Sequence, residues 1–241
     1  MSKMINKYFT VLIILFVSNV LFAQEDQMKE KKITPGNHQF IDLGIGIAKN
    51  QGIITGGYYH NWMLSKKRKI IRNIYIGTGF RFTGFFGSNI YFTSAPPALY
   101  GIAANEDSLR GKTPYIYSAN VFINFGYQFT EKLQIGFDLD AIGFSFGPMG
   151  TPDFISNGVP NIVDAKPTPF NVLLVGANDI GTLNGGLYVR YKLAPKISVR
   201  ATYHTLFTEL TTAQKVQTSP ELNNRFRHGA NLFGVGVGYY F

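Results

Sequence analysis

The chain of 241 residues has no cysteine, few charged residues and no apolar run as long as the 18 or so residues that a membrane-spanning helix needs. The absence of cysteine excludes disulfides, thiolate zinc sites, cysteine nucleophiles and lipid attachment through an N-terminal cysteine. Charged residues make up 15% of the chain, against roughly 25% in average soluble domains. Aromatic residues also reach 15%, and this share excludes a long disordered protein.

The formal net charge of +9 is not gathered into a long basic run, and we expect no nucleic-acid partner. The first segment has the features of an export signal, because Lys3 and Lys7 precede an apolar stretch over 9–23. That stretch has 15 residues, too few to span a bilayer as a helix. We expect 1–23 to be a cleaved signal peptide and 24–39 a short periplasmic arm, with a retained N-terminal anchor as the alternative.

The rest of the chain alternates apolar residues with small or polar ones at a period of two, which is typical of a membrane β-strand. Segment 231–241 is the clearest case, because one of its faces is mostly glycine. A soluble strand would carry polar groups on that face, whereas glycines indicate a crowded barrel interior. The apolar face consists of Phe233, Val235, Val237, Tyr239 and Phe241.

The same alternation predicts eight strands, and two short turns keep the faces of neighbouring strands in phase. One hairpin places Asn124 opposite Asp138, and a second places Arg190 opposite Arg200. The facing of the second strand stays open between Tyr58, His60 and Trp62 on one side and Tyr59, Asn61 and Met63 on the other. The expected strands are 40–48, 53–64, 74–84, 119–129, 133–142, 183–193, 197–203 and 231–241.

Three long connections, 85–114, 147–181 and 208–227, alternate with short turns. Membrane barrels have their short turns on the periplasmic side and their longer loops outside. The predicted fold is therefore all-β, an eight-stranded antiparallel transmembrane up-and-down β-barrel over 40–241. Ten strands would result if 171–175, an apolar piece inside the longest connection, formed part of an extra strand.

These features resemble the small bacterial outer-membrane β-barrels, in the size class of OmpX, OmpW and the OmpA membrane domain. The resemblance covers about 40–241 and is carried most specifically by the alternating strand that ends in Phe241. It implies an integral protein surrounded by outer-membrane lipid in a Gram-negative-type bacterium. It also implies that Phe233, Val235, Val237, Tyr239 and Phe241 form the signal read by the barrel-assembly machinery. A secreted β-sandwich is the alternative fold, although its outer faces would be polar.

Charged residues on the predicted inward face form one candidate site. Because an eight-stranded barrel is filled by its own side chains, we expect a structural ion-pair network there and no open pore. Asp138 and Asp140 are the expected partners of Arg190 and Arg200, since two arginines directly opposite each other are destabilising without compensation. A proton path or a paired-carboxylate catalyst is the functional alternative. The full set is Asp42, Arg81, Asp138, Asp140, Arg190, Lys192 and Arg200.

The first long loop is unusually apolar for a segment in water. One interpretation is a cap over the barrel mouth that packs against 172–175 and encloses a small apolar pocket. The other is a set of strands that project beyond the membrane. The candidate pocket residues are Phe85, Phe86, Tyr91, Phe92, Tyr100, Leu173 and Leu174.

No motif indicates catalysis, a metal or a cofactor. The four histidines lack metal-ligand spacing, and His204, at an outer strand end, has no serine two residues further on. We therefore expect a non-enzymatic structural or surface-interaction protein without a cofactor, whose long loops contact an extracellular or surface protein. Binding or passage of small hydrophobic molecules at the mouth is the second hypothesis, and a lipid-modifying enzyme is the third.

Overall fold

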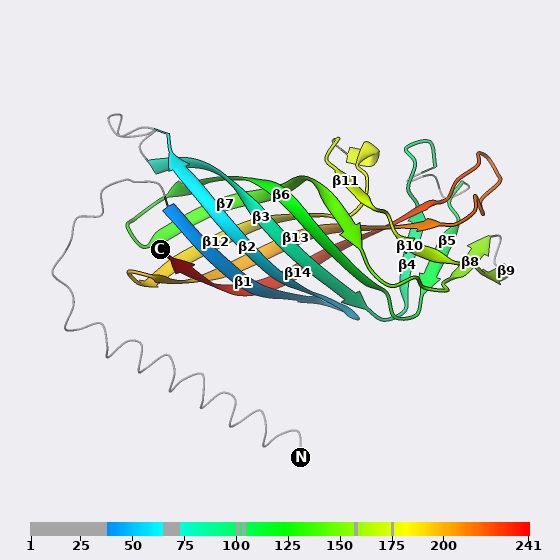
Figure 1. The fold of residues 1–241 in the computed structure, drawn as a ribbon, viewed down its shortest axis with the longest axis horizontal. Coiled ribbons are helices and arrows are strands. Elements are labelled where there is room, and N and C mark those ends of the chain that lie inside the picture. The colour runs from blue at the N-terminus through cyan, green and yellow to red at the C-terminus, as the bar shows by residue number, and fades with distance from the viewer. Residues whose placement is uncertain (1–37, 65–72, 100–101, 103–104, 157–158, 175) are drawn as a thin grey trace, which may run out of the picture.

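The computed structural model describes residues 38–64, 73–99, 102, 105–156, 159–174 and 176–241. The expected signal peptide, nearly all of the expected arm and Tyr100 lie outside the described residues. Eight long antiparallel strands form a closed barrel, because β14 pairs with β13 on one side and with β1 on the other (Figure 1). No helix among the described residues is long and apolar enough to cross a membrane. The strands are β1 (His38–Ala48), β2 (Gln51–Met63), β3 (Ile74–Gly87), β6 (Tyr115–Gln128), β7 (Leu133–Phe146), β12 (Leu183–Ala194), β13 (Ile197–Thr212) and β14 (Arg225–Tyr240).

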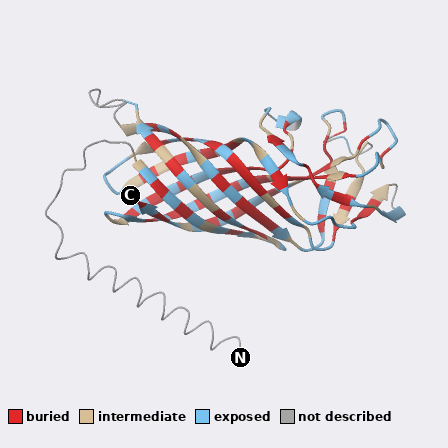
Figure 2. Ribbon diagram, in the orientation of Figure 1, coloured by how far each residue is buried: buried red, intermediate tan, exposed pale blue. Residues whose placement is uncertain are grey.

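The strand pairing confirms the eight-stranded barrel and the register of both predicted hairpins. Asn124 lies opposite Asp138, and Arg190 lies opposite Arg200. In β2, Tyr59 is buried inside the barrel, so the face of Tyr58 and Trp62 points outward. Buried and more exposed residues alternate along the barrel part of the long strands, as the chequered colouring of Figure 2 shows, and the runs of consecutive buried residues lie mainly toward the outer ring.

The outward face of the barrel is apolar on all sides. Exposed side chains such as Leu43, Ile123 and Val235 form a belt around the wall, the surface that a barrel presents to lipid. The inward face carries many glycines, which leave room for large side chains from facing strands. At Gly136, for example, an added Cβ would lie 2.5 Å from the hydroxyl of Tyr188 and 2.6 Å from that of Tyr75.

Beyond the barrel, seven strands form a second, smaller closed structure, which we call the outer ring. β13 and β14 continue into it from the barrel, β14 pairs with β4, β4 with β5, and β5 with β8. β8 pairs with β9, the same ladder continues through the bridge between Gly150 and Ala165, and β10 closes the ring on β13. The ring lies at the end of the molecule opposite the C-terminus (Figure 1). Its short strands are β4 (Ile90–Ser94), β5 (Ser108–Gly111), β8 (Asp153–Ser156), β9 (Val159–Ile162) and β10 (Ala165–Pro167).

The long connections therefore contain more strand than the sequence predicts. β3 extends to Gly87, β13 extends to Thr212, and β14 begins at Arg225. Within the longest connection, β11 (Phe170–Val172) pairs with the C-terminal end of β7. This stretch of β7 lies beyond the residues of β7 that pair with β12. This short strand extends the barrel wall but adds no further full strand, so the barrel has eight strands and not ten.

An apolar core joins the end of the barrel nearest the ring to the outer ring itself. The barrel and the ring contribute to one continuous cluster, so the lumen ends in an apolar plug on the side of the ring. Packing of this kind fixes the orientation of the ring on the barrel. The cluster comprises Ile53, Phe85, Ile90, Phe92, Leu109, Ile116, Phe154, Ala165, Leu206, Leu210, Phe226, Ala230 and Leu232.

We expect the substitution Gly136→Ala to destabilise the barrel, because its Cβ would collide with two buried tyrosines that are hydrogen-bonded to each other at 2.9 Å. The expected loss of unfolding free energy is about 1–3 kcal/mol, as for other overpacked interiors. The measurement is urea-induced unfolding in detergent micelles. Gly150→Ala is the control, since no heavy atom lies within 4 Å of the added Cβ. Equal midpoints for both variants would contradict a crowded lumen.

Candidate functional site

The centre of the barrel lumen holds a guanidinium group clamped between two carboxylates. Arg81 Nη1 lies 2.5 Å from Asp138 Oδ1, and Arg81 Nη2 lies 2.6 Å from Asp140 Oδ1. Asp140 also accepts hydrogen bonds from the Asn120 amide at 2.7 Å and from the Asn184 backbone at 2.9 Å. All three charged side chains are fully buried. The strongest bonds of the lumen thus join β3 to β7 across the interior.

The two arginines that face each other on β12 and β13 share another carboxylate. Arg190 Nη1 lies 2.8 Å from Asp42 Oδ2, and Arg200 Nη2 lies 2.8 Å from Asp42 Oδ1. Arg200 also lies 3.3 Å from Asp138, so it links the two parts of the network. Asp42 therefore supplies most of the compensation that opposed arginines require.

Aromatic rings fill the space around these charges. Arg200 donates a hydrogen bond to the Tyr59 hydroxyl at 2.8 Å, and the guanidinium carbon of Arg190 lies 4.4 Å from the centre of the Phe40 ring. The seventh residue of the predicted set, Lys192, has its Nζ 4.2 Å from the centre of the Tyr240 ring. Cation–π contacts of this kind are favourable where water is excluded.

This arrangement suits a structural role better than a chemical one. Asp138 and Asp140 are both bonded to Arg81 and have no exposed surface, so no substrate can reach them. His204 points into the lumen, where its Nδ1 lies 3.2 Å from Asn184 Oδ1, and does not lie at the outer surface. The described part of the chain contains no group of three or more His, Asp or Glu residues arranged to hold a metal ion.

The residues expected at a mouth pocket do not gather around one cavity. Phe85 and Phe92 are buried in the core that joins the barrel to the outer ring. Phe86 and Tyr91 instead point outward and are exposed. The apolar first loop is thus explained by strands that project beyond the barrel and bury their own aromatic residues.

Two further residues of that predicted pocket lie on the outside of the barrel wall. The backbone of Leu173 donates a hydrogen bond to Ala141 on β7, and Leu174 is exposed. Leu173 lines a groove of about 220 Å³ with Phe137 on the outer wall, and this groove shares no lining residue with the core that contains Phe85. The described part of this segment, 172–174, therefore packs on the barrel, not on the first long loop.

A buried glutamine connects the loops at the far end of the ring. Gln217 Oε1 accepts hydrogen bonds from Ser94 at 2.7 Å and from the Asn223 amide at 3.0 Å. Its Nε2 donates to the carbonyl oxygens of Asn105 at 2.7 Å and Ser219 at 3.1 Å. Both acceptor positions and both donor positions of the amide are thus used within the chain. The connection 213–224 is thereby fixed to the first long loop.

A second polar cluster fastens the longest connection to the β13–β14 hairpin. Arg225 binds Glu209 through two bonds of 2.8 and 2.9 Å, and Arg227 binds the same carboxylate at 3.1 Å. Both arginines also donate to the carbonyl oxygen of Asp179. The sequence pattern assigns 208–227 to a long connection and so misses these residues. In the structure β13 and β14 stay paired through this region, and Glu209 lies directly opposite Arg227.

Charges on the rim of the ring are arranged differently from those in the lumen. Arg110 lies 2.6 Å from Asp153, and the guanidinium hydrogen bonds hold the pKa of this carboxyl below its usual range. The Arg110 side chain is 39% exposed, so solvent screens the pair. Lys112 is exposed nearby, and its charge also lowers the pKa of Asp153.

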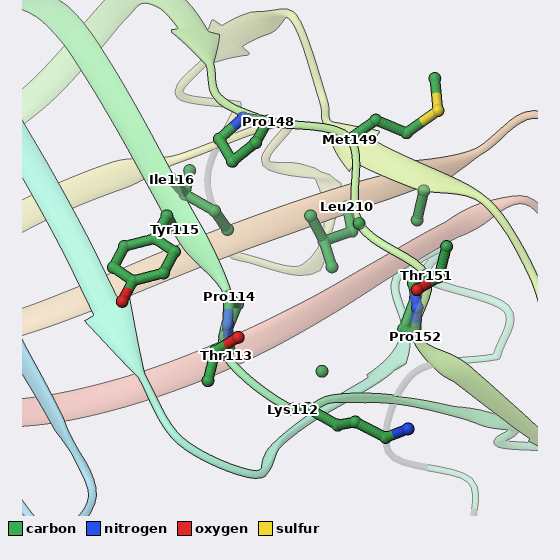
Figure 3. A pocket seen from close by; sticks show the side chains of 13 residues that line it. Lys112, Thr113, Pro114, Tyr115, Ile116, Pro148, Met149, Thr151, Pro152 and Leu210 are labelled. Carbon is green, nitrogen blue, oxygen red and sulfur yellow. The ribbon is translucent and has the colours of Figure 1, made fainter.

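A crevice of about 410 Å³ opens between the barrel rim and the outer ring. Its walls come from the two connections that join β5 to β6 and β7 to β8, 111–116 and 148–152. Figure 3 looks into it, with Leu210 of β13 and Ile116 at its base. This crevice is larger than the groove lined by Leu173, and no sequence pattern predicts it.

We expect Arg81→Met to cost about 3–5 kcal/mol of unfolding free energy, because it leaves buried carboxylates without their shared cation. In a double-mutant cycle, Asp140→Asn should cost less in the Arg81→Met background than alone. The measurement is urea unfolding in micelles. Arg110→Met is the matched control, with an expected loss of at most about 1 kcal/mol. Equal losses at Arg81 and Arg110 would contradict a structural role for the lumen network.

No family model and no curated protein matches the chain. The chain is similar to the solved structure of Ail, the attachment invasion locus protein of Yersinia pestis. The two sequences are 11% identical, the match covers 86% of this chain and 99% of that chain, and the TM-score is 0.38. Neisserial surface protein A has 10% identity, 86% and 97% coverage, and a TM-score of 0.38. A de novo designed transmembrane β-barrel has 8% identity, 86% and 97% coverage, and a TM-score of 0.37. Small outer-membrane β-barrels are thus among its structural neighbours.

Proposed function

We propose that this chain is an integral outer-membrane protein that holds its outer ring outside the cell as a surface for protein contacts. The observation that carries the proposal is the stacking of a closed, apolar-cored ring on a barrel with an apolar belt. The belt fits lipid, whereas the ring has polar connections and salt bridges suited to water. The two parts therefore belong to different surroundings.

The exposed surface of the ring supports a role in binding. Val159 and Ile162 on β9 are each 69% exposed, and Leu222 in the connection to β14 is 60% exposed. Apolar side chains in water on an otherwise well-packed structure are typical of contact surfaces. We therefore propose that β9 and the connection 213–224 contact a surface or extracellular protein.

The filled lumen favours this role over passage of solutes. Ion pairs occupy the middle of the barrel and an apolar plug occupies the end beside the ring. A binding role for small hydrophobic molecules at the mouth gains no support, because Phe85 and Phe92 occupy that space. We make no proposal of catalysis.

The C-terminal strand presents on one face the five residues that the sequence analysis assigns to recognition by the barrel-assembly machinery. Phe233, Val235, Val237, Tyr239 and Phe241 all point outward and are exposed on the barrel wall. In the closed barrel, where β14 pairs with β1, this row still faces outward. We propose that the barrel-assembly machinery binds it.

The absence of cysteine allows single cysteines to report the orientation. Leu222→Cys lies in an outer connection, and Glu131→Cys lies in the exposed turn between β6 and β7. We expect a membrane-impermeant maleimide to label Leu222→Cys on intact cells. Glu131→Cys should react only after the outer membrane is permeabilised. Labelling of both or neither on intact cells would contradict the proposed location.

The contact role is tested with the double substitution Val159→Ser and Ile162→Ser. Cells that express it should attach several-fold less to a protein-coated surface than cells with the unchanged chain, because the apolar contact is lost. Ser88→Ala, at an exposed position outside β9 and the connection 213–224, is the control. Labelling at Leu222→Cys confirms equal surface levels. Unchanged attachment at equal levels would contradict the contact role and leave the location intact.

A further inference from the structure

The crevice between the barrel and the outer ring has the lining of an apolar binding site. Ile116, Ala165 and Leu210 form its buried base, and three prolines line its walls. Proline has no backbone donor, so each of the three removes one possible hydrogen bond to water from these walls. Its volume, about 410 Å³, lies within the range of known ligand sites. The prolines are Pro114, Pro148 and Pro152.

The crevice opens where the apolar belt of the barrel ends. Tyr115, on its wall, is the first residue of β6, and Phe146 is the last residue of β7; both side chains are exposed on the outside of the barrel. Met149 follows a few residues later on the opposite wall and is 66% exposed. Figure 3 shows the Tyr115 ring and the Met149 side chain on opposite sides of the opening. The apolar surface therefore continues from the belt to the crevice.

The lining of the crevice carries one charged side chain, that of Lys112. Arg110, two residues before it in the chain, is paired with Asp153, so Lys112 supplies the net charge of this part of the ring. Lys112 belongs to the crevice wall and is exposed. An ammonium group directly above an apolar belt suits the phosphate of a lipid headgroup.

We infer that the crevice binds one acyl chain of an anionic outer-leaflet lipid, whose phosphate lies beside Lys112. The inference rests on the proposed membrane location and adds a specific lipid site to it. The chain would enter from the lipid along Tyr115 and reach the base at Leu210. A bound chain would fill the junction between ring and barrel and so hold the ring upright on the membrane.

The experiment uses the full-length protein in phosphatidylcholine vesicles with a small fraction of phosphatidylglycerol that carries a diazirine on one acyl chain. After illumination, mass spectrometry locates the adducts. We expect adducts on the outward residues of the barrel strands and on 148–152. Label on the strands alone would overturn the lipid site but not the membrane location. Label on neither would overturn both.

A blocking variant makes the test specific. Gly150 lines the crevice, and its Cβ would meet open space, so Gly150→Leu places a side chain in the cavity without a clash of the Cβ. We expect label on 148–152 to fall about tenfold while label on the strands is unchanged. Gly229→Leu is the matched control, because its Cβ would make only ordinary contacts with Phe207. Equal label in the two variants would overturn the site.

The charge of the headgroup is tested separately. Lys112→Gln should lower label from the phosphatidylglycerol probe several-fold and leave label from a diazirine phosphatidylcholine unchanged. An equal effect on both probes would overturn the role of Lys112. If a diazirine fatty acid labelled 148–152 and neither phospholipid did, the occupant would be a free acid and the lipid assignment would be wrong.

Discussion

Burial of arginine–carboxylate pairs in a narrow lumen is the interaction on which the rest of the structure depends. The backbone ladder closes the wall, but it leaves the side chains of eight strands directed into one small space. Arg81 pairs with Asp138, Arg190 with Asp42, and Arg200 with Asp138, and each pair joins strands that are not neighbours in the sheet. A buried charge without a partner would be costly, so the network also restricts which side chains the lumen accepts.

The outer ring follows from the continuity of two strands. β13 and β14 remain paired well beyond the end of β1, so they present free edges outside the barrel. β10 pairs with one edge and β4 with the other, and the remaining strands close the circle. The exposed edges that would otherwise favour aggregation are thereby covered. Polar residues such as Gln217 and Glu209 then fix the connections at positions where backbone pairing has ended.

Period-two alternation was enough to predict the barrel, its strand count and two registers, because each strand has one face toward lipid and one toward the lumen. It could not identify Asp42 as the partner of Arg190, since contacts across a lumen depend on strand stagger as well as on facing. The ring was missed for a related reason. Thr208, Glu209 and Leu210 are all buried, so a strand covered on both faces shows no alternation. The crevice is formed by proline-rich connections, which have no periodic signal at all.

The central claim is that ion pairs and an apolar plug close the lumen, so that the molecule acts through its outer surface and not as a channel. Ionic conductance of the folded protein in a planar lipid bilayer tests it most directly. The protein is first shown to be folded by a difference in gel migration between unheated and heated samples. The account predicts that its insertion into the bilayer produces no open-channel current. Stable, stepwise and ohmic currents that scale with the amount of inserted protein would contradict it.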